Sequence, residues 1–66
     1  YALVQSLRKY RKKLKLTQEG LARKANISYN TIIKLESGGI IDPRMDTLKK
    51  LAVALGVSID SLVGKA

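Results

Sequence analysis

A chain of 66 residues forms one domain at most, and such a domain buries only about 60% of the surface that its unfolded form exposes. It contains neither Cys nor His, so disulfides, the usual zinc ligands, the usual general base and the thiol nucleophile are absent, and we expect no enzyme, metal or cofactor. With 13 Lys and Arg against 5 Asp and Glu, the net charge of +8 predicts a polyanionic partner, either nucleic acid or an anionic membrane surface.

The first predicted helix covers about residues 2–13. Its apolar stripe recurs at a spacing of three and four residues and consists of Leu3, Leu7, Tyr10 and Leu14. The other face is almost wholly Lys and Arg, because no acid lies within residues 1–16. We interpret this face as solvated and adding long-range attraction for a polyanion, and contact with the flank of bound DNA is the alternative.

The second predicted helix covers about residues 18–25 and follows Thr17, a residue type that caps helix N-termini well. Glu19 lies in its first turn, where the helix dipole favours an acid. Gly20 should cost this helix about 1 kcal/mol relative to Ala. Its buried side is expected to consist of Leu21, Ala22 and Ala25.

Asn26 stands where a tight turn needs a left-handed residue, and Ser28 then caps a third helix over residues 29–37. Gly38 and Gly39 end that helix. At about 100° per residue, Ile32 and Leu35 fall on one side, with Thr31 beside them. The residues spread across the other side are Tyr29, Asn30, Ile33, Lys34 and Ser37.

A loop with two adjacent isoleucines, residues 40–41, leads to the fourth helix, for which Asp42 is the predicted N-cap and Pro43 the first helical residue. The apolar stripe of this helix consists of Met45, Leu48, Leu51, Ala52 and Leu55. Gly56 ends it, and Ser58 caps a short fifth helix with apolar positions Ile59, Leu62 and Val63. No strand pattern of any length is present, so we expect an all-α fold.

Two short helices joined by a three-residue turn, over residues 18–37, have the form of a helix-turn-helix. The first helix of such a pair crosses the phosphate backbone, and the second lies in the major groove. The segments in and around this motif that carry a resemblance are Leu16-Thr17-Gln18-Glu19, Leu21-Ala22, Ile27-Ser28, Thr31-Ile32, Leu35-Glu36-Ser37-Gly38, Pro43 and Leu51-Ala52-Val53-Ala54-Leu55-Gly56-Val57-Ser58. Through them the sequence resembles the lambda-repressor-like, or Cro/C1 (Xre-type), DNA-binding domains over nearly its whole length.

The resemblance implies a compact domain of five helices that binds specific duplex DNA, usually as a dimer on a palindromic operator. It implies that Gln18 contacts phosphate and helps to orient the recognition helix, while the loop amides around Gly39 and the side chain of Arg44 hold the opposite backbone. The third-helix residues that would face DNA are Ser28, Tyr29, Asn30 and Lys34. Arg11 and Glu36 resemble the family's ion pair that ties the first helix to the third, which is a structural role.

Chemistry separates the individual roles further. Asn30 is the favoured base-contacting residue, because an amide can bond to adenine through two hydrogen bonds. Lys34 reaches a base or, more commonly, a phosphate. Tyr29 contacts a thymine methyl or a phosphate, or else packs over the second helix, and Ile33 contacts a methyl group or is a plain surface aliphatic. Ser37 is placed in the candidate interface because it lies on the same side, while Thr17 and Ser28 are caps first.

The leading hypothesis is a repressor-type transcriptional regulator of bacterial or phage origin, which acts on double-stranded DNA in the cytoplasm, at the nucleoid. An adaptor or antitoxin-like module is the alternative, favoured by the apolar loop at Ile40 and Ile41, which would meet a protein partner. These isoleucines, with Val57 and Ile59, form either a dimer seam or the cap of a thin core.

Membrane binding by the first helix is disfavoured, because its apolar residues are needed inside. The chain begins at Tyr1 rather than Met, so we expect this single domain, residues 1–66, to be trimmed or excised from a longer protein.

Overall fold

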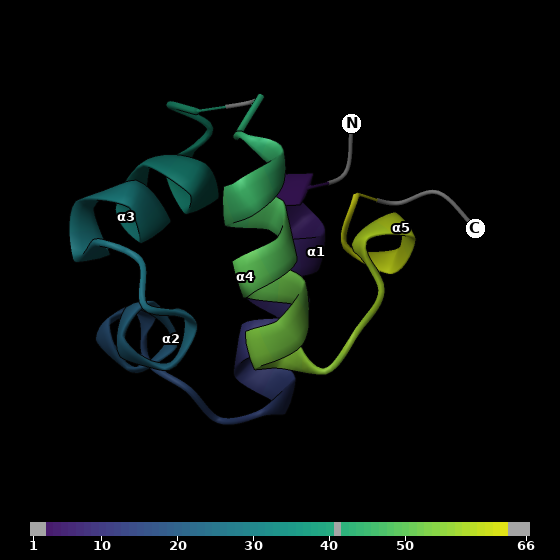
Figure 1. Ribbon diagram of the computed structural model, residues 1–66. Helices are drawn as coiled ribbons and strands as arrows, with labels where there is room; N and C mark the ends of the chain where they lie inside the picture. The colour runs from purple at the N-terminus through teal and green to yellow at the C-terminus, as the bar shows by residue number, and fades with distance from the viewer. Residues whose placement is uncertain (1–2, 41, 64–66) are drawn as a thin grey trace.

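The computed structural model describes residues 3–40 and 42–63, which form five helices and no strand (Figure 1). The helices are α1 (Leu3–Lys13), α2 (Gln18–Ala25), α3 (Tyr29–Ser37), α4 (Met45–Leu55) and α5 (Ile59–Leu62). The prediction of an all-α, five-helix fold is therefore confirmed. None of these helices is both long and apolar enough to cross a membrane.

In the view of Figure 1, α4 lies in the middle, with α2 and α3 to one side of it, α5 to the other and α1 behind. Helix α3 packs against both α1 and α2, and α4 packs against α2 and α5. All five helices contribute aliphatic side chains to one core, whose completely buried members are Leu3, Leu7, Leu21, Ile32, Leu35, Leu51 and Leu62. Because α3 lies on two other helices, its outer face is held in a fixed orientation.

Three of the helices have the N-caps that the sequence predicts, each formed by a local hydrogen bond. The hydroxyl of Thr17 accepts from the Gly20 N–H at 2.9 Å, that of Ser28 from the Thr31 N–H at 3.2 Å, and that of Ser58 from the Ser61 N–H at 3.0 Å. A glycine at position 20 also leaves room for this cap, because a Cβ there would lie 3.2 Å from the Thr17 hydroxyl oxygen. These caps supply acceptors for amides that the helices leave without partners.

The predicted start of the fourth helix is wrong by two residues. Arg44 rather than Asp42 is the N-cap, with φ −64° and ψ 153°, and its carbonyl accepts the first helical bond from the Leu48 N–H. Pro43 does not determine where the helix starts, because its fixed φ suits an extended segment as well as a helix. The prediction of Met45 in the buried stripe is also wrong, since this first helical residue is 57% exposed.

The apolar stripe of α1 ends at Tyr10 and not, as predicted, at Leu14. Leu14 is 43% exposed, and Leu16 instead packs against the core. The chain turns here because Lys15 adopts a left-handed conformation with φ 58°, and the N–H of Leu16 donates to the carbonyl of Arg11 at 3.0 Å. Leu14 thus continues the helical spacing of the stripe but is exposed, and Leu16 packs against the core instead.

Asn26 supplies the left-handed residue of the turn between α2 and α3, with φ 57° and ψ 47°. We expect Asn26→Ala to lower the free energy of unfolding by roughly 1 kcal/mol, because a β-carbon disfavours this conformation and Ala lacks the side-chain amide that eases it. Asn26→Gly should be neutral or stabilising by up to about 1 kcal/mol. Urea denaturation followed by circular dichroism measures both. A glycine variant less stable than the alanine variant would contradict the assignment.

Candidate nucleic-acid interface

Helix α3 presents one polar face to solvent and buries the other. Ile32, Leu35 and Glu36 are buried, whereas Asn30 and Lys34 are exposed and Tyr29 is 43% exposed. Among the described residues, none donates to or accepts from the side-chain amide of Asn30, so both of its hydrogen-bonding groups face solvent. The remaining predicted residues of this face are the exposed Ser37, the half-buried Ile33 and the capping Ser28.

Beneath this face, Glu36 forms a bidentate ion pair with Arg11. The Arg11 Nε donates to the Glu36 Oε2 at 2.6 Å, and its Nη2 donates to Oε1 at 3.0 Å. The Glu36 side chain is only 2% exposed and that of Arg11 13%, so both charges lie largely out of water. The third nitrogen of Arg11, Nη1, donates to the Leu16 carbonyl at 2.8 Å. One guanidinium therefore joins α1, α3 and the loop that enters α2.

Gln18 lies at the start of α2 and contacts the same carboxylate. Its Nε2 donates to the Glu36 Oε1 at 3.2 Å. An amide nitrogen carries two protons, so this bond uses one and leaves the second for another acceptor. Sequence reasoning missed this contact, because residues 18 positions apart in the chain give no signal of it. Glu36 thus fixes the orientation of the side chain that was expected to contact phosphate.

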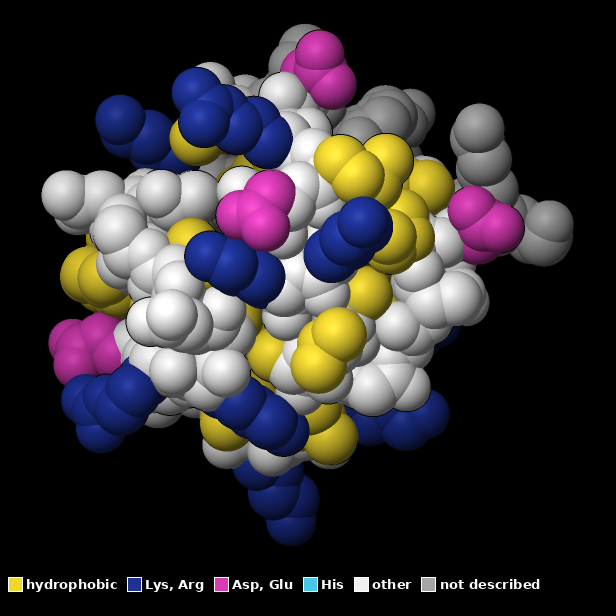
Figure 2. Space-filling view, viewed as in Figure 1, with side chains coloured by type: hydrophobic (Ala, Val, Ile, Leu, Met, Phe, Trp, Pro, Cys, Tyr) yellow, Lys and Arg dark blue, Asp and Glu magenta, His cyan; other side chains and the backbone are white. Residues whose placement is uncertain are grey.

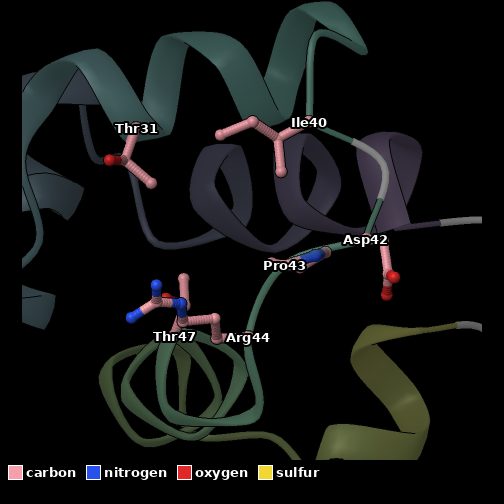
Figure 3. Close-up of a pocket in the computed structure, with 6 residues that line it drawn as sticks. All are labelled: Thr31, Ile40, Asp42, Pro43, Arg44 and Thr47. Atoms are coloured by element: carbon pink, nitrogen blue, oxygen red, sulfur yellow. The ribbon is translucent and has the colours of Figure 1, made fainter.

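The loop after α3 and the start of α4 form the far edge of the candidate interface. Arg44 and Thr47 lie at the start of α4 and face Thr31 and Ile40 across a hollow of about 270 Å³ (Figure 3). Arg44 is exposed and makes no side-chain cap, so its guanidinium can reach a ligand. Gly39 is exposed at the end of α3. The hydroxyl of Ser37, by contrast, donates to the Lys34 carbonyl at 3.2 Å and so lies against its own helix.

The sequence profile of the helix-turn-helix family matches residues 7–62, which is most of the chain. The chain belongs to the helix-turn-helix family of the Cro/C1 type. Helices α2 and α3 form the helix-turn-helix itself, as predicted. The family consists of DNA-binding regulators rather than enzymes.

Three relatives of this helix-turn-helix domain span phages, bacteria and archaea. The immunity repressor protein of Bacillus phage phi105 is 38% identical over 92% of this chain and 42% of its own length. The uncharacterized HTH-type transcriptional regulator RghRB of Bacillus subtilis is 42% identical over 94% of this chain and 45% of its own. The uncharacterized HTH-type transcriptional regulator MJ0272 of Methanocaldococcus jannaschii is 41% identical over 85% of this chain and 83% of its own length. The chain thus spans less than half the length of the first two.

Ile40, one of the two isoleucines that favoured a protein partner, lies beside the helix-turn-helix. Ile40 is half-buried and packs against the core, and its N–H donates to the Lys34 carbonyl at 3.1 Å. Val57 and Ile59 are likewise half-buried against the core. Ile41 lies outside the described residues. Ile40 therefore has a structural reason to be apolar, which weakens the argument for an adaptor surface in this loop.

Proposed function

We propose that this domain binds duplex DNA sequence-specifically, as the DNA-binding part of a repressor-type transcriptional regulator. The observation that carries the proposal is the division of α3, which buries Ile32, Leu35 and Glu36 and exposes Tyr29 and Asn30 on a chain of net charge +8. In this proposal α3 enters the major groove, which is wide enough for an α-helix. Occupation of an operator then blocks the access of polymerase.

The two edges of the interface hold the phosphate backbones on either side of that groove. At one edge, the free amide proton of Gln18 donates to a phosphate oxygen, in the field of the α2 N-terminus. At the other, Arg44 and the backbone around Gly39 contact the opposite strand. Lys34 contacts a phosphate at the margin of α3. These contacts position the helix but carry no sequence information.

Base contacts then supply the specificity. The exposed amide of Asn30 can accept from and donate to adenine in the bidentate geometry that distinguishes it from other bases. Tyr29 and Ile33 offer apolar surface to thymine methyl groups. The domain, residues 1–66, acts in the cytoplasm at the nucleoid, as one part of a longer chain that binds DNA as a dimer. Two half-sites about one helical turn apart would match the two-fold symmetry of such a dimer.

Selection of bound sequences from a random pool of duplex DNA tests this proposal. We expect a symmetric enriched site, bound at least ~10³-fold more tightly than scrambled duplex at the same salt concentration. Charge alone would instead give binding that is equal for every sequence and lost steeply as salt rises. That result would contradict the proposal.

Asn30→Ala should weaken binding to the selected site by about 1–3 kcal/mol and relax the preference at one base pair of each half-site. The physical reason is the loss of a bidentate amide while every phosphate contact remains. Lys34→Ala is the matched control on the same helix, and it should weaken binding to all sequences about equally. Both effects are measured by titrating each variant with a duplex set that varies one position at a time. Equal loss on every duplex for Asn30→Ala would assign this residue to the backbone instead.

A further inference from the structure

A second hollow, of about 270 Å³, lies between the C-terminal parts of α2 and α4. Its lining is apolar at the floor and cationic at the rim, and consists of Lys24, Ala25, Lys49, Lys50, Val53 and Ala54. The two alanines are 5% and 6% exposed. Their small side chains leave the space between the helices unfilled. Figure 2 shows hydrophobic side chains of this face set among Lys and Arg.

Val53 stands out in this hollow, because 82% of it is exposed, more than any other large hydrophobic residue of the described chain. Folding does not explain a valine there, since it contributes nothing to the core and a β-branched residue is a weaker helix former than Lys or Glu. An exposed aliphatic group beside a concave apolar floor, ringed by polar side chains, has the form of a protein-binding surface.

The rim around Val53 carries one sign of charge. Lys24, Lys49 and Lys50 are all exposed. Of these three lysines, only Lys50 has an acidic neighbour among the described residues. Its Nζ lies 3.5 Å from the Asp46 Oδ2, and the Asp46 side chain is itself 76% exposed. A second copy of the chain seated here by two-fold symmetry would bring six lysines together, on subunits of charge +8 each. An acidic occupant fits this rim, and another copy does not.

The hollow also lies away from the proposed DNA interface. Gln18 begins α2 and Lys24 is near its end, which places them about 9 Å apart along the helix axis. Arg44 caps α4 and Val53 lies in its last turn, about 13 Å further along. A partner in the hollow would therefore contact the C-terminal parts of α2 and α4. The proposed phosphate contacts lie at the N-termini of these helices, so the domain can hold the partner and DNA together.

We propose that this hollow is the docking site for an acidic segment of a partner protein, which places an aliphatic side chain against Val53 and carboxylates against Lys24, Lys49 and Lys50. A partner held here while α3 occupies DNA would be recruited to the operator. The surface itself does not depend on the proposed DNA function, because none of its residues takes part in that interface.

Titration of the isotope-labelled domain with a synthetic acidic helical peptide, glutamate-rich with leucines at i, i+4 and i+7, tests the site by nuclear magnetic resonance. We expect the amide shifts to centre on the hollow. Val53→Ser should weaken binding by about tenfold, and so should the triple variant Lys24→Gln, Lys49→Gln, Lys50→Gln. A peptide with serine in place of leucine should bind as weakly as the wild-type peptide binds Val53→Ser. Circular dichroism verifies that each variant is folded.

The matched control is the triple variant Lys9→Gln, Lys12→Gln, Lys13→Gln on α1, which changes the net charge equally on three exposed residues outside the hollow. It should retain most of the affinity for the peptide. Equal weakening by both triple variants, or none by Val53→Ser, would overturn the proposal in favour of unspecific attraction. Shifts centred on α3 would overturn it too, because the peptide would then be imitating DNA. Binding of selected DNA, measured on the same variants, is a separate readout and should be unchanged by Val53→Ser.

Discussion

Glu36→Ala is expected to lower the free energy of unfolding by about 3–5 kcal/mol, the usual cost of removing one partner from a buried ion pair. The carboxylate is 2% exposed and accepts two hydrogen bonds from Arg11 and one from Gln18. Its removal leaves a guanidinium that is 13% exposed without its counter-charge. At roughly 0.05–0.15 kcal/mol per residue, a chain of this length has a total stability of about 3–10 kcal/mol. The expected loss is therefore a large share of the total, and the variant should melt at a much lower temperature than wild type.

Thermal unfolding followed by circular dichroism measures this effect, with Glu19→Ala as the matched control. Glu19 is an exposed carboxylate, and its only expected contribution is to the dipole at the start of α2, so its loss should cost less than about 1 kcal/mol. Arg8→Ala should also have a small effect, because Arg8 is 52% exposed and its Nε lies 3.9 Å from the Glu36 carboxylate. Equal melting temperatures for wild type and Glu36→Ala would contradict a stabilising role for the pair.

The same carboxylate connects stability to the DNA interface. Because Gln18 donates one amide proton to Glu36, the direction of its second proton is set by a buried group rather than by solvent. Replacing Glu36 therefore affects both the attachment of α3 to α1 and the pre-orientation of a proposed phosphate contact.

Much of the fold follows from local signals. Each of the three capping residues precedes an amphipathic segment, and its hydroxyl accepts from an amide only three residues away. These residues are Thr17, Ser28 and Ser58. Asn26 likewise reveals a left-handed turn from its residue type alone. Such interactions need no knowledge of the rest of the molecule, which is why the sequence predicts them.

The errors arise where local chemistry allows two outcomes. Helical spacing continues through Leu14, and nothing in the sequence shows that Lys15 takes a left-handed conformation and brings Leu16 inward instead. Pro43 is compatible with a helix start and with the extended segment that is found. The contact of Gln18 with Glu36 and the hollow around Val53 are tertiary features, since each needs two helices in place before it exists.

Leu35→Ala is the second substitution with a large expected effect, a loss of about 2–5 kcal/mol in the free energy of unfolding. Leu35 is completely buried on the inner side of α3, so its truncation leaves a cavity directly beneath the proposed recognition face. Val53→Ala is the matched control, because a side chain 82% exposed should change stability by no more than about 0.5 kcal/mol. Urea denaturation compares the two, and equal stability would contradict the assignment of Leu35 to the core.

Addition of the selected DNA should partly restore Leu35→Ala. A ligand that binds only the folded state stabilises it by about 2.7 kcal/mol when its free concentration is 100 times its dissociation constant. The melting temperature of the variant should therefore rise with DNA concentration, and at low temperature its preference among sequences should match that of wild type, because Asn30 still lies on the outer side of the helix. A folded variant that has lost its sequence preference would instead show that the position of α3, and not only its stability, depends on Leu35.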